Sequence, residues 1–377
     1  MKKILLTLTI MAVALGAAAA TMSSVQSTLD KVKKRLVPDT RTTLWDVTTS
    51  HQGGKILVKG VVGNSDLKNE LEKAFKKEQR VQVEVNVAET FQPMSKRWAL
   101  VKLAIATLRC EPKHSAEVAT QAIMGTPVKV LDNDGDWYRI QMPDKYIAWV
   151  PESSLFFRDE DQMKEWRTTE RYIVTAYDSR LVTTPGGDET VSDLVLGCIL
   201  EYRGEQDGWI HLVTPDGRDG WVEDNVMANF ATWRKRPLDI DLVERTARRM
   251  MGSGYLWGGT TTKVTDCSGL MKISYFASGI ILQRDASQQA LTGKKIEDWH
   301  NCELGDLLFF GNSKTGRVTH VGMYLRDGKY IHCSGQVKIN SLEPGASDYL
   351  YSPLSISRVK GEEETPGITS AARHPWY

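Results

Sequence analysis

The sequence lacks several features that would place it in a simple class. Its 377 residues carry a net charge of +1, which gives no reason to expect nucleic acid or an anionic membrane as a partner. The N-terminal apolar run, residues 4–16, is too short to span a bilayer. Neither Cys-x-x-Cys nor His-x-x-x-His spacing occurs, so the sequence predicts no metal site and no cofactor.

The N-terminus nevertheless has the three parts of an export signal. Lys2 and Lys3 form a positive region, residues 4–16 are apolar, and residues 17–20 are alanines that suit a signal peptidase. These features predict a signal peptide over residues 1–20, cleaved after Ala20. No cysteine stands directly after that point, so we expect no membrane anchor and an exported, soluble protein that is periplasmic or secreted.

Cysteine is scarce, with five residues in the chain. Exported proteins often form disulfides, but the distribution here argues against a disulfide framework. Cys110 and Cys198 fall in separate repeats, and Cys267 is needed as a free thiol. Cys302 and Cys333 share one domain, and the sequence does not decide whether they lie close enough to bridge.

Cys267 is the residue around which the chemistry can be built. Asp266 is a suitable N-cap for a helix that begins at Cys267 and stops near Gly279. A thiol in the first turn sits at the positive end of the helix, which can bring a cysteine pKa from about 8.5 to roughly 3.5–7.5. The alternative is a small buried apolar side chain, which is the usual role of a lone cysteine.

Two downstream histidines favour the catalytic interpretation. His320 lies in a strand predicted for residues 317–325, and His332 lies in the next strand, residues 329–335. The order Cys–His–His supplies a nucleophile, a base and a residue that orients the base. We therefore expect Cys267 to attack a carbonyl, His320 to carry the proton and His332 to hold His320.

Several short motifs occur together with these residues. They lie at residues 255–259, 266–269, 284–286, 305–310, 320–324 and 331–332. In combination they resemble the NlpC-type family of papain-like cell-wall cysteine peptidases over residues 235–362. The whole chain resembles the γ-D-glutamyl-L-diamino-acid endopeptidases of the dipeptidyl-peptidase VI type, in which SH3-like modules precede the catalytic domain.

An internal repeat precedes that domain. At an offset of 72 residues, Trp137 aligns with Trp209 and Trp149 with Trp221, and no gap is needed. Short strands and Pro-Asp turns fit small β-barrels, and the pattern resembles bacterial SH3-like domains at residues 96–157 and 170–230. The charged linker at 158–171 is expected to be partly helical.

The remaining segments complete an α+β architecture. Residues 21–95 alternate between helical and strand patterns and form a small α/β module, which resembles substrate-binding modules of the BON type and receives no chemistry. The resemblance implies a papain-like catalytic domain, a helix packed on an antiparallel sheet, at residues 235–362. The polar tail, residues 363–377, is expected to be disordered.

The resemblance also implies a substrate and its binding residues. The expected reaction is hydrolysis of the γ-D-glutamyl–diaminopimelate bond in peptidoglycan peptides with a free N-terminal L-alanine, by a monomer without cofactor. The first SH3-like module would close the substrate site with Glu111 and Tyr146, Glu117 being an alternative acid. Asp285 would hold the free amine, and Ser287 is a further candidate contact.

Three residues near Cys267 have two interpretations each. Tyr255 can donate to an oxyanion or substrate, or be a half-buried aromatic. Asp266 and Ser268 can line the pocket, or simply cap the helix. Three other functions also stay open: a general endopeptidase acting on intact wall, an SH3-mediated peptidoglycan-binding protein with weak or no catalysis, and a papain-like acyltransferase.

Overall fold

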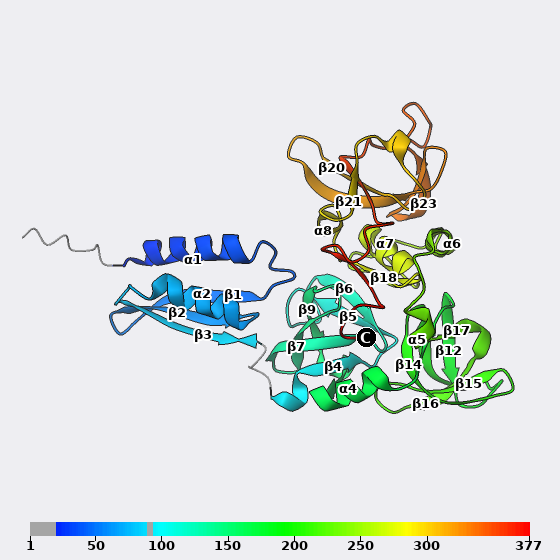
Figure 1. Ribbon diagram of the computed structural model, residues 1–377, viewed down its shortest axis with the longest axis horizontal. Helices are drawn as coiled ribbons and strands as arrows, with labels where there is room; N and C mark the ends of the chain where they lie inside the picture. The colour runs from blue at the N-terminus through cyan, green and yellow to red at the C-terminus, as the bar shows by residue number, and fades with distance from the viewer. Residues whose placement is uncertain (1–19, 89–92) are drawn as a thin grey trace, which may run out of the picture. The chain divides into compact units, whose positions relative to one another are not determined.

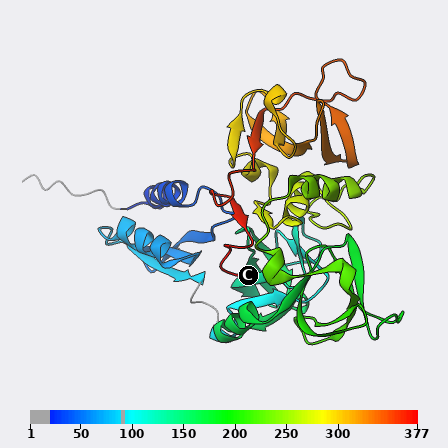
Figure 2. The same ribbon diagram turned by 45° about the vertical axis from the view of Figure 1, so that its right-hand side comes forward.

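The computed structural model describes residues 20–88 and 93–377, which divide into two compact units (Figures 1 and 2). The first unit comprises residues up to 40 together with 44–87, and the second comprises residues 41–43 together with 88–377. The expected signal peptide lies outside the described residues except for Ala20. Within the described ranges, every helix is too short or too polar to cross a membrane.

The first unit has two helices and a three-stranded sheet. Its elements are α1 (Met22–Leu36), β1 (Trp45–Gln52), β2 (Lys55–Val62), α2 (Ser65–Phe75) and β3 (Val81–Val87). The sheet order is β1-β2-β3, with β1 antiparallel and β3 parallel to β2. Apolar residues at helical spacing, Val25, Leu29 and Val32 on α1, pack into its core as the sequence pattern predicts.

The second unit contains two seven-stranded antiparallel sheets. The first comprises β4 (Trp98–Val101), β5 (Ile105–Arg109), β6 (Val118–Ile123), β7 (Pro127–Asp134), β8 (Trp137–Gln141), β9 (Ile147–Pro151) and β10 (Leu155–Arg158). The second comprises β11 (Arg171–Val174), β12 (Asp178–Val182), β13 (Thr190–Val195), β14 (Ile199–Gln206), β15 (Trp209–Val213), β16 (Asp219–Glu223) and β17 (Met227–Asn229). The helix α4 (Glu160–Thr168) connects them, as expected from the charged linker.

The repeat found in the sequence is confirmed strand by strand. An offset of 72 residues carries the bounds of β7, β8 and β9 onto those of β14, β15 and β16. The strand orders also correspond, β10-β4-β7-β8-β9-β5-β6 in the first sheet and β17-β11-β14-β15-β16-β12-β13 in the second. The two sheets are therefore copies of one small barrel.

The remaining elements form the C-terminal part of the second unit. Its helices are α5 (Phe230–Trp233), α6 (Ile240–Arg249), α7 (Cys267–Phe276) and α8 (Ala286–Gln289). Its strands are β18 (Ile280–Leu282), β19 (Lys294–Ile296), β20 (Leu307–Asn312), β21 (Arg317–Tyr324), β22 (Lys329–Ser334), β23 (Gln336–Ser341), β24 (Ser355–Arg358) and β25 (Ile368–Ser370). The described residues of the unit also include four single 3₁₀ turns, η1 (Met94–Lys96), η2 (Glu152–Ser154), η3 (Asp224–Val226) and η4 (Trp299–Asn301).

The helix α7 packs against an antiparallel sheet with the strand order β19-β24-β20-β21-β22-β23 (Figure 1). Leu270 and Met271 of α7 share one buried core with Val321 and Met323 of β21. The turn between β21 and β22 is tight, with positive φ at Asp327 and Gly328, as the Asp-Gly pair predicts. The α+β prediction, with a helix on an antiparallel sheet, is confirmed.

The prediction of a disordered C-terminal tail is wrong. The strand β25 pairs with β18, and in Figure 1 the red segment continues to the first barrel. His374 Nε2 lies 2.9 Å from the main-chain oxygen of Pro143, and Arg234 donates to that of Tyr377 at 2.7 Å. The polar composition of the tail led to the wrong prediction because only a few residues attach the tail to the rest of the unit. Those residues are the large aromatics near its end.

We expect Tyr377→Ala to lower the free energy of unfolding of the protein by about 3 kcal/mol, the usual cost of removing a buried aromatic side chain. Tyr377 is 7% exposed and packs beside Phe230, whereas Tyr351 is 62% exposed. Urea denaturation of both alanine variants measures the difference. A loss from Tyr377→Ala no larger than that from Tyr351→Ala would contradict an anchored tail.

Candidate active site

Cys267 is the first residue of α7 and lines a cleft of about 820 Å³. The helix begins where the sequence predicts, because Asp266 Oδ1 accepts the main-chain N–H of Gly269 at 2.7 Å as an N-cap. The helix ends at Phe276, and Gly279 follows with a positive φ of 79°. The thiol therefore lies at the N-terminus of a helix, at the wall of a cleft large enough for a peptide.

The two predicted histidines lie side by side, and a third residue continues their chain of hydrogen bonds. His320 Nε2 lies 2.7 Å from His332 Nδ1, and His332 Nε2 lies 2.8 Å from Asn340 Oδ1. Asn340 uses its amide nitrogen to donate to the main-chain oxygen of Asp348, so its Oδ1 accepts from His332. His332 Nδ1 then accepts from His320 Nε2–H, which leaves His320 Nδ1 with the lone pair that a general base needs.

Asn340 was not predicted from the sequence. The signal that could have found it is strand periodicity: Lys338 pairs with His332 across β22 and β23, and Asn340 follows two residues later on the same face. Finding it requires the register between the two strands, which the sequence pattern alone does not fix.

The thiol and imidazole are both neutral in this environment. Burial raises the pKa of Cys267 to about 11, aided by the negative charge of Asp266, while the N–H groups of Val321 and Ser268 act in the opposite direction. Burial, His332 and Lys338 lower the pKa of His320 to about 4. The expectation of a resting thiolate is therefore not met, because burial outweighs the helix terminus.

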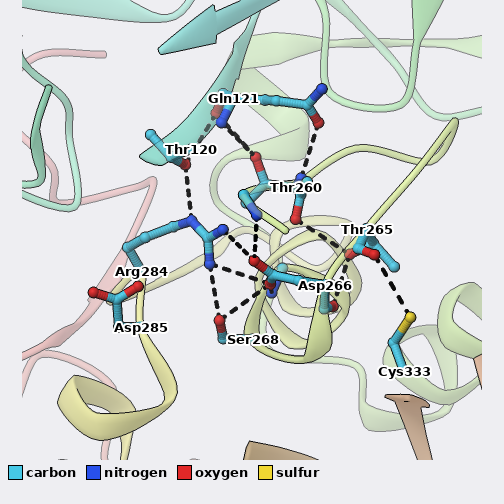
Figure 3. A network of polar contacts seen from close by, with 12 residues as sticks. Thr120, Gln121, Thr260, Thr265, Asp266, Ser268, Arg284, Asp285 and Cys333 are labelled. Atoms are coloured by element: carbon cyan, nitrogen blue, oxygen red, sulfur yellow. Dashed lines mark hydrogen bonds and ion pairs between the residues drawn. The ribbon is translucent and has the colours of Figure 1, made fainter. Parts of the chain in front are cut away.

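A buried ion pair fixes the residues on either side of Cys267. Figure 3 shows the Arg284 guanidinium between Thr120 and the pair Asp266 and Ser268. Arg284, 2% exposed, donates to Asp266 Oδ2 at 2.5 Å, to Ser268 Oγ at 2.8 Å and to Thr120 Oγ1 at 2.9 Å. Asp266 and Ser268 are thus bound to Arg284, and through it to strand β6 of the first barrel.

Arg284 and Thr120 were not singled out as site residues. Arg284 occurs in a motif that drew attention to the neighbouring Asp285, and nothing local distinguishes a buried arginine from an exposed one. Thr120 belongs to no recognisable motif, because its role depends on contact with a residue 164 positions away in the sequence.

A second buried ion pair holds the helix α7 to the first barrel. Lys272 Nζ lies 2.6 Å from Asp144 Oδ2 and also donates to the main-chain oxygen of Leu282 at 2.8 Å. Asp144 Oδ1 accepts the main-chain N–H of Tyr146 at 2.9 Å. The same carboxylate therefore positions both α7 and Tyr146.

Tyr146, Asp285 and Ser287 meet at one end of the cleft. The Tyr146 hydroxyl donates to Asp285 Oδ2 at 3.2 Å, and burial, followed by the charge of Asp285, raises the Tyr146 pKa, which keeps the phenol neutral. Arg41 Nη1 contacts the same Asp285 oxygen at 2.8 Å and Ser287 Oγ at 3.1 Å. Arg41 was not predicted, since its position in the chain is far from every motif.

The two candidate acids of the first barrel have different surroundings. Glu117 lines the cleft. Glu111, which is exposed as Glu117 is, pairs with Lys113 at 2.6 Å and does not line the cleft. The geometry therefore favours Glu117, the alternative of the two predictions, as the acid that faces a ligand.

Tyr255 lines the cleft together with Cys267. Burial, followed by the charges of Cys267 and Asp266, raises the pKa of its phenol, so the hydroxyl keeps its proton. Within residues 20–88 and 93–377 the Tyr255 hydroxyl has no hydrogen-bond partner, so its proton is available to a ligand. Across the same ranges, no three side chains of His, Cys, Asp or Glu are grouped to hold a metal ion, and all five cysteines are free.

Comparison with known proteins agrees with this arrangement. Residues 252–354 match the model of the NlpC/P60 family, and residues 108–155 match that of the bacterial dipeptidyl-peptidase Sh3 domain. The chain thus carries an NlpC/P60 domain preceded by an SH3-like domain, as the sequence motifs indicated.

Particular relatives are similar over most of their length. The chain is 28% identical to the Gamma-D-glutamyl-L-lysine dipeptidyl-peptidase of Bacillus cereus, over 58% of this chain and 68% of that protein. It is 26% identical to Dipeptidyl-peptidase 6 of Lysinibacillus sphaericus, over 65% of this chain and 92% of the relative. The crystal structure of an NlpC/P60 family protein from Bacillus cereus matches with a TM-score of 0.61 at 23% identity, over 69% of this chain and 99% of that one, which shows the same fold.

The lowered pKa of His320 predicts activity in acid. His320 must be neutral to accept a proton, and with a pKa near 4 it is neutral at all higher pH values. The acid limb of kcat/KM should therefore fall below about pH 5.5, not near the ordinary histidine value of about 6.5. Lys338→Met, which removes a nearby positive charge, should move the limb upward. A limb at or above pH 6.5 in the folded wild-type protein would contradict this environment.

Proposed function

We propose that this protein is a cysteine peptidase that hydrolyses the γ-D-glutamyl–diamino acid bond of peptidoglycan-derived peptides, diaminopimelate being the expected diamino acid. The observation that carries the proposal is Cys267 at a helix N-terminus in the cleft, with His320, His332 and Asn340 linked in a relay on the sheet that packs against that helix. The main-chain N–H of Val321, next to His320 in the chain, acts on the Cys267 thiol. The printed names of the relatives, Gamma-D-glutamyl-L-lysine dipeptidyl-peptidase and Dipeptidyl-peptidase 6, support the same reaction.

The chemistry begins from a neutral pair. As Cys267 Sγ attacks the γ-carbonyl carbon, its proton passes to His320 Nδ1, and the new imidazolium is stabilised through its Nε2–H bond to His332. The oxyanion accepts from the main-chain N–H of Cys267 and from the Tyr255 phenol.

The intermediate then collapses to products. His320 returns its proton to the departing amine of the diamino acid, which breaks the amide and leaves a γ-glutamyl thioester. Water, deprotonated by His320, adds to the thioester carbon and releases the γ-carboxylic acid and the Cys267 thiol. No redox partner or cofactor is needed for this balance.

We further propose a preference for peptides with a free N-terminal L-alanine. Asp285 and Glu117 give the cleft end a negative character, and Tyr146 is part of its wall. A hydrogen bond to a charged group contributes about 1.5–3 kcal/mol, so an ammonium group there is favoured over an uncharged one. Acetylation removes the cation, so the modified peptide gains no charged contact with these carboxylates.

The place of action belongs to the same proposal. The positively charged and apolar N-terminus is typical of export, and the relatives named above are dipeptidyl-peptidases. We propose that the protein acts outside the cytoplasm, on short wall-derived peptides, with its first barrel serving as part of the substrate site.

The first test compares peptides by mass spectrometry. Wild-type protein should convert L-Ala-γ-D-Glu-diaminopimelate, or the lysine analogue, to the dipeptide and the free diamino acid, and Cys267→Ala should abolish this while remaining folded. N-acetylated tripeptides should react about ten- to a hundredfold more slowly, as expected when a charged contact is lost. Equal kcat/KM on free and acetylated peptides would remove the free-amine preference, and a Cys267→Ala protein with substantial turnover would end the cysteine-peptidase proposal.

The second test separates the two acids of the first barrel. Glu117→Gln should raise KM for the free-amine tripeptide about tenfold, the effect of losing one charged contact, with kcat little changed. Glu111→Gln, which removes the same charge outside the cleft, should leave KM within about twofold. The reverse pattern of steady-state constants would assign the ammonium contact to Glu111.

A further inference from the structure

Arg41 is fixed to the wall of the cleft by its backbone. Its main-chain oxygen accepts from the N–H of Ile147 at 2.7 Å, and the main-chain oxygen of Thr42 accepts from Gln141 Nε2 at 2.9 Å. The stretch 41–43 therefore lies along strands β8 and β9, next to Tyr146, and belongs to the second unit. The side chain of Arg41, in contrast, is 40% exposed and lines the cleft.

The guanidinium of Arg41 forms an ion pair with Asp285, the carboxylate proposed to bind the substrate amine. Arg41 Nη1 lies 2.8 Å from Asp285 Oδ2, and the Tyr146 hydroxyl donates to the same oxygen at 3.2 Å. The Asp285 side chain also accepts the main-chain N–H of Gln288 in a capping box. The Asp285 carboxylate that an incoming ammonium group would contact therefore already accepts hydrogen bonds from other residues.

We propose that Arg41 is a specificity-determining residue that occupies the ammonium subsite until a cationic substrate displaces it. This inference rests on the proposed function. Both groups are cations that seek the same oxygen, so one can replace the other without leaving Asp285 unpaired. Only the half-exposed side chain has to move, because the backbone is held by Ile147 and Gln141.

If the ligand has to displace Arg41, the charge of the ligand decides whether it binds. A peptide with a free amine compensates Asp285 for the loss of Arg41. An acetylated or glycan-linked peptide carries no cation, so removing Arg41 would leave the carboxylate partly buried without a counter-ion. Such a ligand therefore encounters a subsite that Arg41 still fills, and exclusion follows from charge as well as from the shape of the wall.

The test is the effect of Arg41→Met on the free-amine tripeptide. If Arg41 competes with substrate, its removal should lower KM about two- to fivefold, the range for one partly exposed ion pair, with kcat within about twofold. The affinity of the product L-Ala-γ-D-Glu for a Cys267→Ala protein, measured by calorimetry, should rise by the same factor when Arg41→Met is added. Arg41→Lys, which keeps a competing cation, should stay closer to wild type.

The control is Lys113→Met, which also removes one positive charge from the first-barrel side but pairs with Glu111 outside the cleft. An unchanged or raised KM in Arg41→Met, or an equal fall in Lys113→Met, would overturn the role of Arg41. Thermal unfolding establishes that each variant is folded, and Arg41→Gln replaces Arg41→Met if it is not. Failure of wild-type protein to cleave or bind any free-amine peptide would instead reject the proposed function.

Discussion

The buried ion pair between Asp266 and Arg284 is the interaction on which the site depends. A single charge placed in a protein interior costs several kcal/mol unless it is paired and hydrogen-bonded, so neither residue is tolerable here without the other. Asp266 also caps α7 and accepts the main-chain N–H of Gly258 at 3.0 Å. The position of Cys267 is therefore linked to Arg284, and through Thr120 to the first barrel.

The same kind of coupling recurs at the substrate end. Asp144 binds Lys272 of α7 and the N–H of Tyr146, and Tyr146 donates to Asp285 beside α8. The buried carboxylates of Asp266 and Asp144 thus connect α7 to two parts of the first barrel, strand β6 and the turn between β8 and β9. The first barrel consequently acts as part of the active site, and a catalytic domain without it would lack both the support of its nucleophile and the end of its cleft.

The features that the sequence predicted depend on neighbours in the chain. The start of α7, the turn at Asp327 and Gly328 and the repeat of 72 residues all follow from caps, turn residues and periodicity. Arg284, Asn340 and Arg41 escaped because their roles arise from contacts across many residues. The thiol pKa was misjudged for the same reason: the helix terminus is visible in the sequence, but the burial that outweighs it is not.

Charge pairing also explains how the two ends of the cleft differ. At the reacting end, Cys267 and His320 are neutral, so charge develops there only when a substrate carbonyl is attacked. At the end proposed to bind the substrate amine, Asp285 already has a counter-ion in Arg41. A cationic substrate then exchanges one ion pair for another instead of creating a new one, so its net gain in affinity is modest, while a neutral ligand has to break a pair and gains nothing in return. Discrimination against the neutral ligand is in this way larger than the attraction of the cationic one.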